Sequence, residues 1–526
     1  MSGQFYSMGF TVARTTNSKK NKPSKKGKTL PFLLGLLFLL SSVPSSMRSQ
    51  ERQATPLRAK DKKEQISARL ERAIPRLLDE GVVPGLSIAL IQKGQLAWHR
   101  GFGVKNAQTK EPVTANTTFE AASLSKPVFA YAVLKLVDAG KLDLDTPLQR
   151  YLPGNYAVGN DARLAQITAR HVLSHTPGFP NWRRPGGPLT IHFTPGERFS
   201  YSGEGFVYLA KVVEHITGEQ FNDFMKRMVF DPLGMPDSSY VWRDSYDTQH
   251  SFPHSATGNP VGQNKSNQPN AAASLRTTAQ DYGRFLLALL HGTGLKPATR
   301  RQMFTPQIKL SESGTNNTKS APEKLSPYLS WGLGWGLQTT ADGLAFWHWG
   351  DNGNTKAYVV VYDKQQLGLV VFTNSANGLG VIPEIIQEAI AGEQPALAWL
   401  KYESYKSPAK VLLKSILTNG AGAALQEYRA WRKGRAAGEV VNENQMNRLG
   451  YDLMSVQRVK DAIEVFKLNV EDYPQSANVW DSLGEAYLRD GQTELAIKHY
   501  QRAVELDPQN VGAVDALKKL REKQED

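Results

Sequence analysis

Apolar residues recur with helical and strand periods in the first part of the chain. A helical spacing of apolar residues from Ile66 to Leu78 predicts an amphipathic helix. Two apolar runs flank Lys93 and Gly94, an arrangement typical of a β-hairpin. A second helical pattern, "YAVLKLVDAGKLDLD", ends at Gly140.

Further along, the pattern changes to helices and then returns to strands. Residues 145 to 260 are rich in Gly, Pro and Asn, with short helical stretches. Thr278 and Asp281 form a predicted capping box that opens the helix "YGRFLLALL". Three apolar runs, "LAFWHWG", "AYVVVYD" and "LGLVVFTN", predict antiparallel strands, and a helix follows near 381 to 391. The order predicts an α+β fold, in which helices flank an antiparallel sheet that carries an all-helical insertion.

The last part of the chain contains a repeat of 34 residues. Leu449-Gly450, Ala462, Phe466 and Pro474 recur 34 positions later as Leu483-Gly484, Ala496, Tyr500 and Pro508. Small residues allow two helices to pack closely, and aromatic residues fill the space between them. The period and pattern resemble two tetratricopeptide repeats, residues 443 to 510, with a final helix near 511 to 523 that caps them.

These patterns divide the chain into five segments. We expect an N-terminal basic and apolar segment at 1–46, a leader at 47–65, an α+β domain at 66–392, a linker with helices at 393–440 and tetratricopeptide helices at 441–526.

The formal net charge of +14 does not indicate nucleic-acid binding. Seven of the positive charges lie in residues 1 to 46, which contain no acidic residue, and removing them leaves +7. No stripe of Lys and Arg interleaved with aromatic residues follows, so we expect no nucleic-acid partner.

The N-terminal segment has the order of a secretory signal peptide. Its basic residues precede the apolar run "LPFLLGLLFLL" and then the small residues "SSVPSS". This order predicts export to a bacterial periplasm or to the medium. An uncleaved anchor in the inner membrane is the alternative, although eleven apolar residues are short for a span.

The chain has no cysteine, which excludes disulfides and cysteine-based metal sites and nucleophiles. The ten histidines have no metal-ligand spacing, so we expect neither a metal nor a cofactor.

Candidate chemistry begins in "FEAASLSKPV", residues 119 to 128. Ser123 and Lys126 are three residues apart, so on a helix they share a face, whereas Ser125 is adjacent to Lys126 and does not. A serine needs a base to become a nucleophile, and a lysine serves only when it is neutral. Ser-x-x-Lys alone is weak evidence: a second copy, Ser407 to Lys410, has no companion motif and is interpreted as chance.

Two later motifs strengthen the interpretation. "PGERFSYSGEGF" places Tyr201 and Ser202 before an apolar helix, and "FWHWGDNG" places His348 and Gly350 at a strand end. In this order the three motifs resemble the serine β-lactamase and penicillin-binding-protein superfamily, with class C enzymes and their esterase and D-peptidase relatives as the nearest group. The resemblance covers about residues 66 to 392.

The resemblance implies a role for each motif. Ser123 is the expected acylated nucleophile, Lys126 moves its proton, and Tyr201 shares the base role and protonates the leaving group. The expected oxyanion and substrate-binding residues are Ser202, Gly203, His348, Gly350 and Asp351, with the oxyanion donors being the main-chain N–H groups of Ser123 and Asp351. His171 and His175 lie outside the ordered motifs and are interpreted as structural.

Two departures from the family pattern bear on the substrate. Gly203 stands where many relatives have asparagine, and Glu204 beside it accepts rather than donates hydrogen bonds when ionised. His348 replaces the lysine of class C enzymes, and a mostly neutral imidazole attracts a substrate carboxylate less strongly.

Three functions remain open at this stage. The first is a secreted serine hydrolase acting through an acyl-enzyme on esters or on D-amino-acid amides and peptides. The second is a β-lactamase or D-alanyl-D-alanine carboxypeptidase. The third is a catalytically silent scaffold protein. The expected partners are a small-molecule or peptide substrate, and a protein, a peptide or a second copy of the chain at the repeats.

Overall fold

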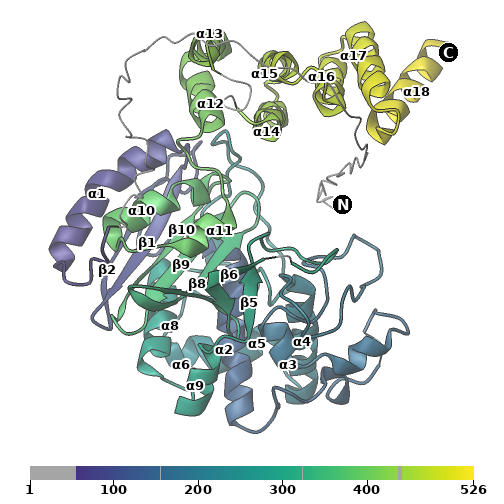
Figure 1. Ribbon diagram of the computed structural model, residues 1–526. Helices are drawn as coiled ribbons and strands as arrows, with labels where there is room; N and C mark the ends of the chain where they lie inside the picture. The colour runs from purple at the N-terminus through teal and green to yellow at the C-terminus, as the bar shows by residue number, and fades with distance from the viewer. Residues whose placement is uncertain (1–54, 155, 323, 436–440, 526) are drawn as a thin grey trace, which may run out of the picture. The chain divides into compact units, whose positions relative to one another are not determined.

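The computed structural model describes residues 55–154, 156–322, 324–435 and 441–525. The predicted signal peptide lies outside these residues. Eight described strands form one antiparallel sheet in the order β2-β1-β10-β9-β8-β7-β6-β5 (Figure 1). The bounds are β1 (Gly85–Gln92), β2 (Gln95–Gly103), β5 (Ile308–Ser311), β6 (Leu325–Trp331), β7 (Gly336–Thr340), β8 (Gly343–Asp351), β9 (Lys356–Tyr362) and β10 (Leu367–Thr373). A separate two-stranded sheet pairs β3 (Phe119–Glu120) with β4 (Arg276–Thr277).

One face of the large sheet is covered by helices that precede its first strand and follow its last strand in the sequence. α1 (Lys63–Glu80) and α10 (Ile382–Ala389) bury their apolar sides against side chains of β1, β8, β9 and β10. α11 (Pro395–Leu400) joins the same core through Trp399. Figure 1 shows these three helices lying over the sheet.

The opposite face packs against the helical insertion and two long helices. α2 (Ser125–Asp138) and α8 (Ala279–His291) contribute most of their apolar residues to this core. The remaining helices are α3 (Ala169–Leu173), α4 (Gly203–Thr217), α5 (Phe221–Met225), α6 (Asp231–Leu233), α7 (Tyr246–Gln249) and α9 (Pro297–Met303). Short turns η1 (Ala122–Leu124), η2 (Leu148–Arg150), η3 (Ala162–Gln166), η4 (Lys226–Phe230) and η5 (Gly378–Gly380) connect them.

The predicted α+β fold is confirmed, including the first helix, the hairpin at Lys93-Gly94 and the three consecutive strands β8, β9 and β10. Lys93 and Gly94 both have positive φ, as a tight hairpin turn requires. The predicted capping box is half correct. Thr278 caps α8 by accepting from the N–H of Asp281, but the Asp281 carboxylate instead accepts from Asp237 N–H and Ser238.

The C-terminal helices repeat one contact 34 residues apart. They are α12 (Pro408–Asn419), α13 (Ala421–Arg432), α14 (Glu443–Ser455), α15 (Val459–Asp472), α16 (Ala477–Arg489), α17 (Thr493–Leu506) and α18 (Val511–Glu525). A Cβ on Gly450 would lie 2.4 Å from the Phe466 ring, and one on Gly484 would lie 3.0 Å from the Tyr500 ring. The glycines therefore allow each aromatic ring to pack against the preceding helix.

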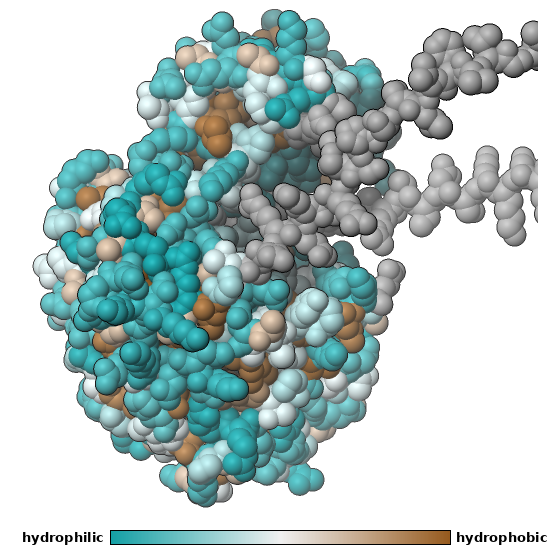
Figure 2. Space-filling view, turned by 60° about the vertical axis from the view of Figure 1, so that its left-hand side comes forward, coloured by the Kyte–Doolittle hydropathy of each residue, from teal (hydrophilic) through white to brown (hydrophobic). Residues whose placement is uncertain are grey.

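Hydrophobic residues are scattered among hydrophilic ones on the face that Figure 2 shows. Among the described residues, no helix is both long and apolar enough to span a bilayer. Two of the large apolar side chains that are exposed, Trp182 and Tyr402, contact the predicted site residues described next.

Candidate active site

Ser123 lies on a tight turn that leads directly into α2. The turn η1 places Ser123 at its centre, and Ala122 before it has a φ of +49°, in the left-handed region. Such a backbone conformation costs roughly 1–3 kcal/mol for a residue other than glycine and is frequent at active sites. Ser123 is half-buried, whereas the residues on both sides are buried. The turn thus presents one hydroxyl from a buried segment.

Lys126 reaches the Ser123 hydroxyl from the first turn of α2. Its Nζ lies 3.0 Å from Ser123 Oγ and 2.9 Å from the carbonyl oxygen of Ala272. The side chain has no exposed surface, and this burial lowers the pKa of Lys126 well below its usual value. A lysine that is neutral near pH 7 accepts a proton from a serine, so the geometry fits a nucleophile and its base.

Ser125 is fully engaged in holding the turn. Its hydroxyl donates to the Ala122 carbonyl at 2.6 Å and accepts from Leu275 N–H at 3.0 Å. It has no exposed surface. Ser125 therefore fixes the shape of the nucleophile turn and has no free hydroxyl for a substrate.

Tyr201 lies against Lys126, immediately before α4. The Lys126 Nζ is 4.7 Å from the centre of the Tyr201 ring. Burial raises the pKa of Tyr201, and the nearby Ser123 hydroxyl opposes part of this rise. The two hydroxyls do not reach hydrogen-bond geometry, and the Tyr201 hydroxyl has no partner in the described part of the chain. Tyr201 is therefore a protonated phenol at neutral pH and has a proton to donate.

His348 and Gly350 lie on β8 beside the nucleophile turn. His348 is fully buried, and burial together with Lys126 lowers its pKa to about 3, so the ring is neutral. Its Nδ1 donates to the Trp349 carbonyl at 2.7 Å, which leaves Nε2 as a bare acceptor. A Cβ on Gly350 would lie 2.5 Å from the Ala121 carbonyl oxygen. Only glycine allows the turn to approach β8 this closely.

The main-chain N–H of Asp351 lies on a free edge of β8. The N–H of Asn352 bonds to Thr355 at the β8–β9 turn, so by antiparallel alternation Asp351 N–H points away from β9. On the other side, β7 pairs with β8 only as far as Trp347. This N–H is thus available to a ligand beside Ser123.

Ser202 and Gly203, which the sequence predicts to bind substrate, both contact the loop before α4. The Ser202 hydroxyl caps α4 through Gly205 N–H at 3.1 Å and donates to the Pro180 carbonyl at 3.0 Å. A Cβ on Gly203 would lie 2.7 Å from the Trp182 ring. Trp182 thus fills the space that a longer side chain at position 203 would need, and 46% of its surface is exposed.

Glu204 holds the loop that carries Trp182. Its carboxylate accepts two hydrogen bonds from the Arg183 guanidinium, at 3.0 and 2.6 Å, and one from Arg183 N–H. Asn181 accepts from the N–H groups of Gly203 and Glu204 through its carbonyl, both at 3.1 Å. Glu204 therefore fixes a loop and is not a substitute for the missing amide.

His175, interpreted from sequence as structural, lies directly behind Tyr201. The two rings stack with centroids 4.2 Å apart, and His175 Nδ1 accepts from Ser202 N–H at 3.0 Å. Burial, then Lys126 and His348, lower the pKa of His175 well below its usual value. His171 is structural, since its Nδ1 lies 3.1 Å from the Gln166 carbonyl. The position of His175 in "HVLSHTPGF", a segment that resembles the family, was the available signal.

Three buried polar atoms around Lys126 have no hydrogen-bond partner among the described residues: the Tyr201 hydroxyl, His175 Nε2 and His348 Nε2. Buried polar groups without partners are rare and mark places where water or a ligand binds. Their grouping around one buried lysine indicates a reaction site.

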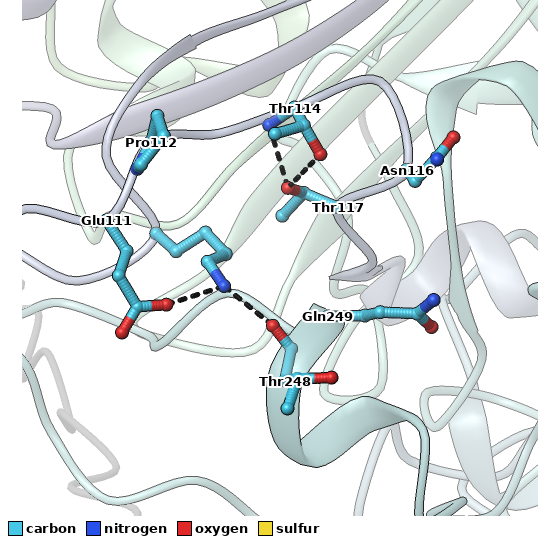
Figure 3. Close-up of a pocket in the computed structure, with 8 residues that line it drawn as sticks. Glu111, Pro112, Thr114, Asn116, Thr117, Thr248 and Gln249 are labelled. Carbon is cyan, nitrogen blue, oxygen red and sulfur yellow. Dashed lines mark hydrogen bonds and ion pairs between the residues drawn. The ribbon is translucent and has the colours of Figure 1, made fainter.

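A separate cavity of about 240 Å³ contains none of the predicted site residues (Figure 3). Its Lys105 pairs with Glu111 at 2.7 Å and donates to the Thr248 carbonyl at 2.6 Å. The lysine of this cavity is therefore already committed to two partners. Across the described ranges, no three His, Cys, Asp or Glu side chains are grouped to hold a metal ion.

Comparison with known proteins identifies the family. The chain belongs to the β-lactamase family, whose model, described as Beta-lactamase, matches residues 70–389. A model described as Tetratricopeptide repeat matches residues 477–510. Membership of the first family indicates a serine hydrolase, and the resemblance inferred from the three motifs is confirmed.

Individual relatives agree with this class at low identity. Penicillin-binding protein 4* of Bacillus subtilis (strain 168) is 26% identical over 294 residues, which cover 49% of this chain and 60% of that protein. Protein flp of Staphylococcus aureus (strain N315) is 22% identical over 325 residues, 58% of this chain and 62% of that protein. The chain thus spans about three fifths of the length of these curated relatives.

Solved structures share the fold. EstCE1, a hydrolase with promiscuous acyltransferase activity, has a TM-score of 0.54 at 20% identity, covering 63% of this chain and 99% of its own. The D-alanine carboxypeptidase AmpC of Burkholderia cenocepacia has a TM-score of 0.50 at 19% identity, covering 62% and 99%.

Proposed function

We propose that the chain hydrolyses esters or D-amino-acid amides and peptides through an acyl-enzyme on Ser123. The observation that carries the proposal is the contact of 3.0 Å between Ser123 Oγ and the buried Lys126 Nζ. No other described contact joins a half-exposed serine to a lysine whose pKa is lowered by burial.

The proposed acylation uses four groups. Ser123 Oγ attacks the substrate carbonyl carbon, and its proton passes to Lys126 Nζ. The N–H groups of Ser123 and Asp351 stabilise the oxyanion, each worth roughly 2.7–4 kcal/mol in the transition state. Tyr201 donates its proton to the leaving group as the C–O or C–N bond breaks, and the proton on Lys126 replaces it. Because burial raises the pKa of Tyr201, its hydroxyl carries the proton that this step requires.

Deacylation reverses the proton path. Water attacks the acyl carbonyl carbon and gives a proton to Lys126. The bond to Ser123 Oγ breaks, and that oxygen takes the proton back.

The charges at the end of β8 favour substrates without a free carboxylate. His348 is neutral, and Lys356 is committed to the Asp351 carboxylate and to the Gly353 carbonyl at 2.7 Å. Neither residue offers a free positive charge to the carboxylate of a penicillin or of a peptide C-terminus. We therefore favour neutral esters and amides over β-lactams and D-alanyl-D-alanine.

A hydrolysis panel tests the proposal. We expect turnover of short p-nitrophenyl esters or D-amino-acid amides, slow or no turnover of nitrocefin, and loss of all turnover in Ser123→Ala. Rapid nitrocefin turnover would assign a β-lactamase instead. Failure of a fluorophosphonate probe to label Ser123 would favour a silent scaffold.

We also propose that the protein is exported and that the repeats bind a peptide, a protein or a second copy of the chain. Export is supported by the order of basic, apolar and small residues in 1–46. Cell fractionation with N-terminal sequencing tests export. Light scattering of the full chain and of a chain that ends at residue 440 separates self-association from binding of another partner.

A further inference from the structure

The strand end that carries Asp351 is held by a residue from outside the three motifs. The hydroxyl of Tyr402 donates to Asp351 Oδ2 at 2.8 Å. The other carboxylate oxygen, Oδ1, accepts from Gly353 N–H at 2.8 Å and from Lys356 Nζ. The Asp351 side chain therefore has a partner on each oxygen, and its main chain is fixed at the point where β8 has a free edge.

The position of Tyr402 is itself set by buried contacts on both sides. Before it, Trp399 donates to the Ser311 carbonyl at 2.6 Å and packs against Trp347 and Trp349. After it, Tyr405 is buried in the same core. Lys401 has a φ of +54° and ends α11, so the chain reverses and directs Tyr402 towards β8. The contact with Asp351 is thus part of the packed catalytic body.

Tyr402 is also within electrostatic reach of the catalytic tyrosine. Although 37% of the Tyr402 surface is exposed, partial burial of the side chain, then the Asp351 carboxylate, raise the pKa of Tyr402, and Tyr201 adds to the rise. The Tyr402 hydroxyl therefore stays protonated and donates to the carboxylate throughout the neutral range. A hydrogen bond to a charged acceptor is roughly twice as strong as a neutral one.

We infer that Tyr402 is a positioning residue of the active site, which acts by holding Asp351 so that its main-chain N–H stays aimed at the oxyanion. The inference rests on the proposed function. Residue 402 lies beyond the segment that the family model matches, 70–389, so the family motifs do not supply it. Since the same segment leads into α12, the C-terminal helices are joined to the catalytic body next to a residue that shapes its chemistry.

The first test removes only the hydroxyl. Removing an oxyanion donor outright costs about 10²–10³-fold in kcat. Loosening one costs less, so we expect Tyr402→Phe to lower kcat about 5- to 20-fold while KM stays within twofold. Affinity for a boronic acid, which forms a tetrahedral adduct with the serine, falls by a similar factor. Tyr328→Phe is the matched control, because Tyr328 is 54% exposed on β6 and its hydroxyl makes no described contact.

A double-mutant cycle separates positioning from a general effect on stability. Tyr402→Phe has nothing to hold in an Asp351→Ala background, so we expect it to cause no further loss of kcat there. An equal loss in both backgrounds, an effect confined to KM, or an unchanged kcat in Tyr402→Phe would each overturn the inference.

A measurement without substrate tests the role of Tyr402 independently of the proposed hydrolase function. Hydrogen exchange of the peptide that spans residues 347–356 reports the order of the β8–β9 turn. We expect faster exchange there in Tyr402→Phe, and no change in Tyr328→Phe. If the wild-type chain hydrolyses nothing, the proposed function fails by itself, and unchanged exchange in this peptide would still refute the role of Tyr402.

Discussion

The chain contains two Ser-x-x-Lys tetrapeptides, and both stand at the start of a helix. Around Ser123, the lysine side chain turns back to the serine hydroxyl and has no exposed surface. Around Ser407, the hydroxyl instead accepts from the N–H of Lys410 at 3.2 Å and donates to Glu403 at 2.6 Å. The Lys410 Nζ does not bond to Ser407 but donates to the side-chain oxygen of Asn377.

The difference lies in what surrounds each pair. The Ser407 hydroxyl satisfies a helix N-terminus, which is the common use of serine there. At the first site, Ser123 does not cap a helix N-terminus. Instead, Ser125 ties the turn to Leu275, so the Ser123 hydroxyl is left for Lys126. The same four-residue pattern thus brings the lysine to the serine hydroxyl only where a neighbouring residue takes over the serine's structural role.

The largest expected effect is on turnover. Ser123→Ala removes the nucleophile, and we expect kcat to fall by at least about 10⁴-fold, in line with nucleophile deletions elsewhere. Ser407→Ala should retain wild-type kcat and KM. Steady-state kinetics on the best ester, with mass spectrometry to locate the acylated residue, compares the two variants. Acyl transfer to any other serine would contradict the assignment.

The lysines should differ almost as strongly. Lys126→Met keeps the volume of the buried side chain but removes the base, and general-base catalysis is worth about 10²–10⁴-fold. Lys410→Met should change kcat less than twofold. Pre-steady-state measurement of the acylation rate tests both variants; equal losses would mean that Lys126 acts only through the fold.

The pH profile gives a third contrast. Because burial lowers the pKa of Lys126, the neutral base forms at a pH well below the ordinary value of 10.5. As pH rises through this lowered pKa, the proton leaves and kcat/KM should rise about tenfold per pH unit below it. The rising limb should be kept in Lys410→Met. In Lys126→Met, the residual kcat/KM should not rise with pH in this range. If it still rises, the titrating group is not Lys126.

The smallest expected effect is on the free energy of unfolding, and here the substitution at Ser407 should have the larger effect. Ser407→Ala removes a helix cap and should lower the free energy of unfolding by about 0.5–2 kcal/mol. Ser123 caps no helix N–H, so Ser123→Ala should change stability less. Denaturant unfolding of both variants tests this order of stabilities. The prediction is wrong if Ser123→Ala is the more destabilised variant.

Sequence reasoning found what local spacing encodes. Local spacing of apolar residues predicts the first helix and the strands β8 to β10. Spacing also predicts the shared face of Ser123 and Lys126, and the recurrence of residues 34 positions apart predicts the helical repeats. Periodicity does not encode which distant loops meet. For this reason the sequence did not predict that the Pro180–Arg183 loop packs against Ser202 and Gly203, or that Tyr402 reaches Asp351.

Burial was the second limit. His175 and His171 look alike in sequence, yet only His175 stacks on Tyr201, because α3 ends between them and His175 takes a positive φ of 56°. The sequence does not predict that a lysine and two histidines are buried in one site, because this burial arises only when the sheet and the insertion pack together.

The pairing of β1 with β10 has a consequence for how the protein is made. Ser87 lies opposite Phe372, which the ribosome adds 285 residues later. At roughly 5–20 residues per second, β1 waits on the order of 15–60 s for its neighbour. During synthesis the edge of β1 that will pair with β10 therefore stays unpaired, and it is open to aggregation or to a chaperone. The helical repeats, which contact chiefly their neighbours in sequence, have no such delay.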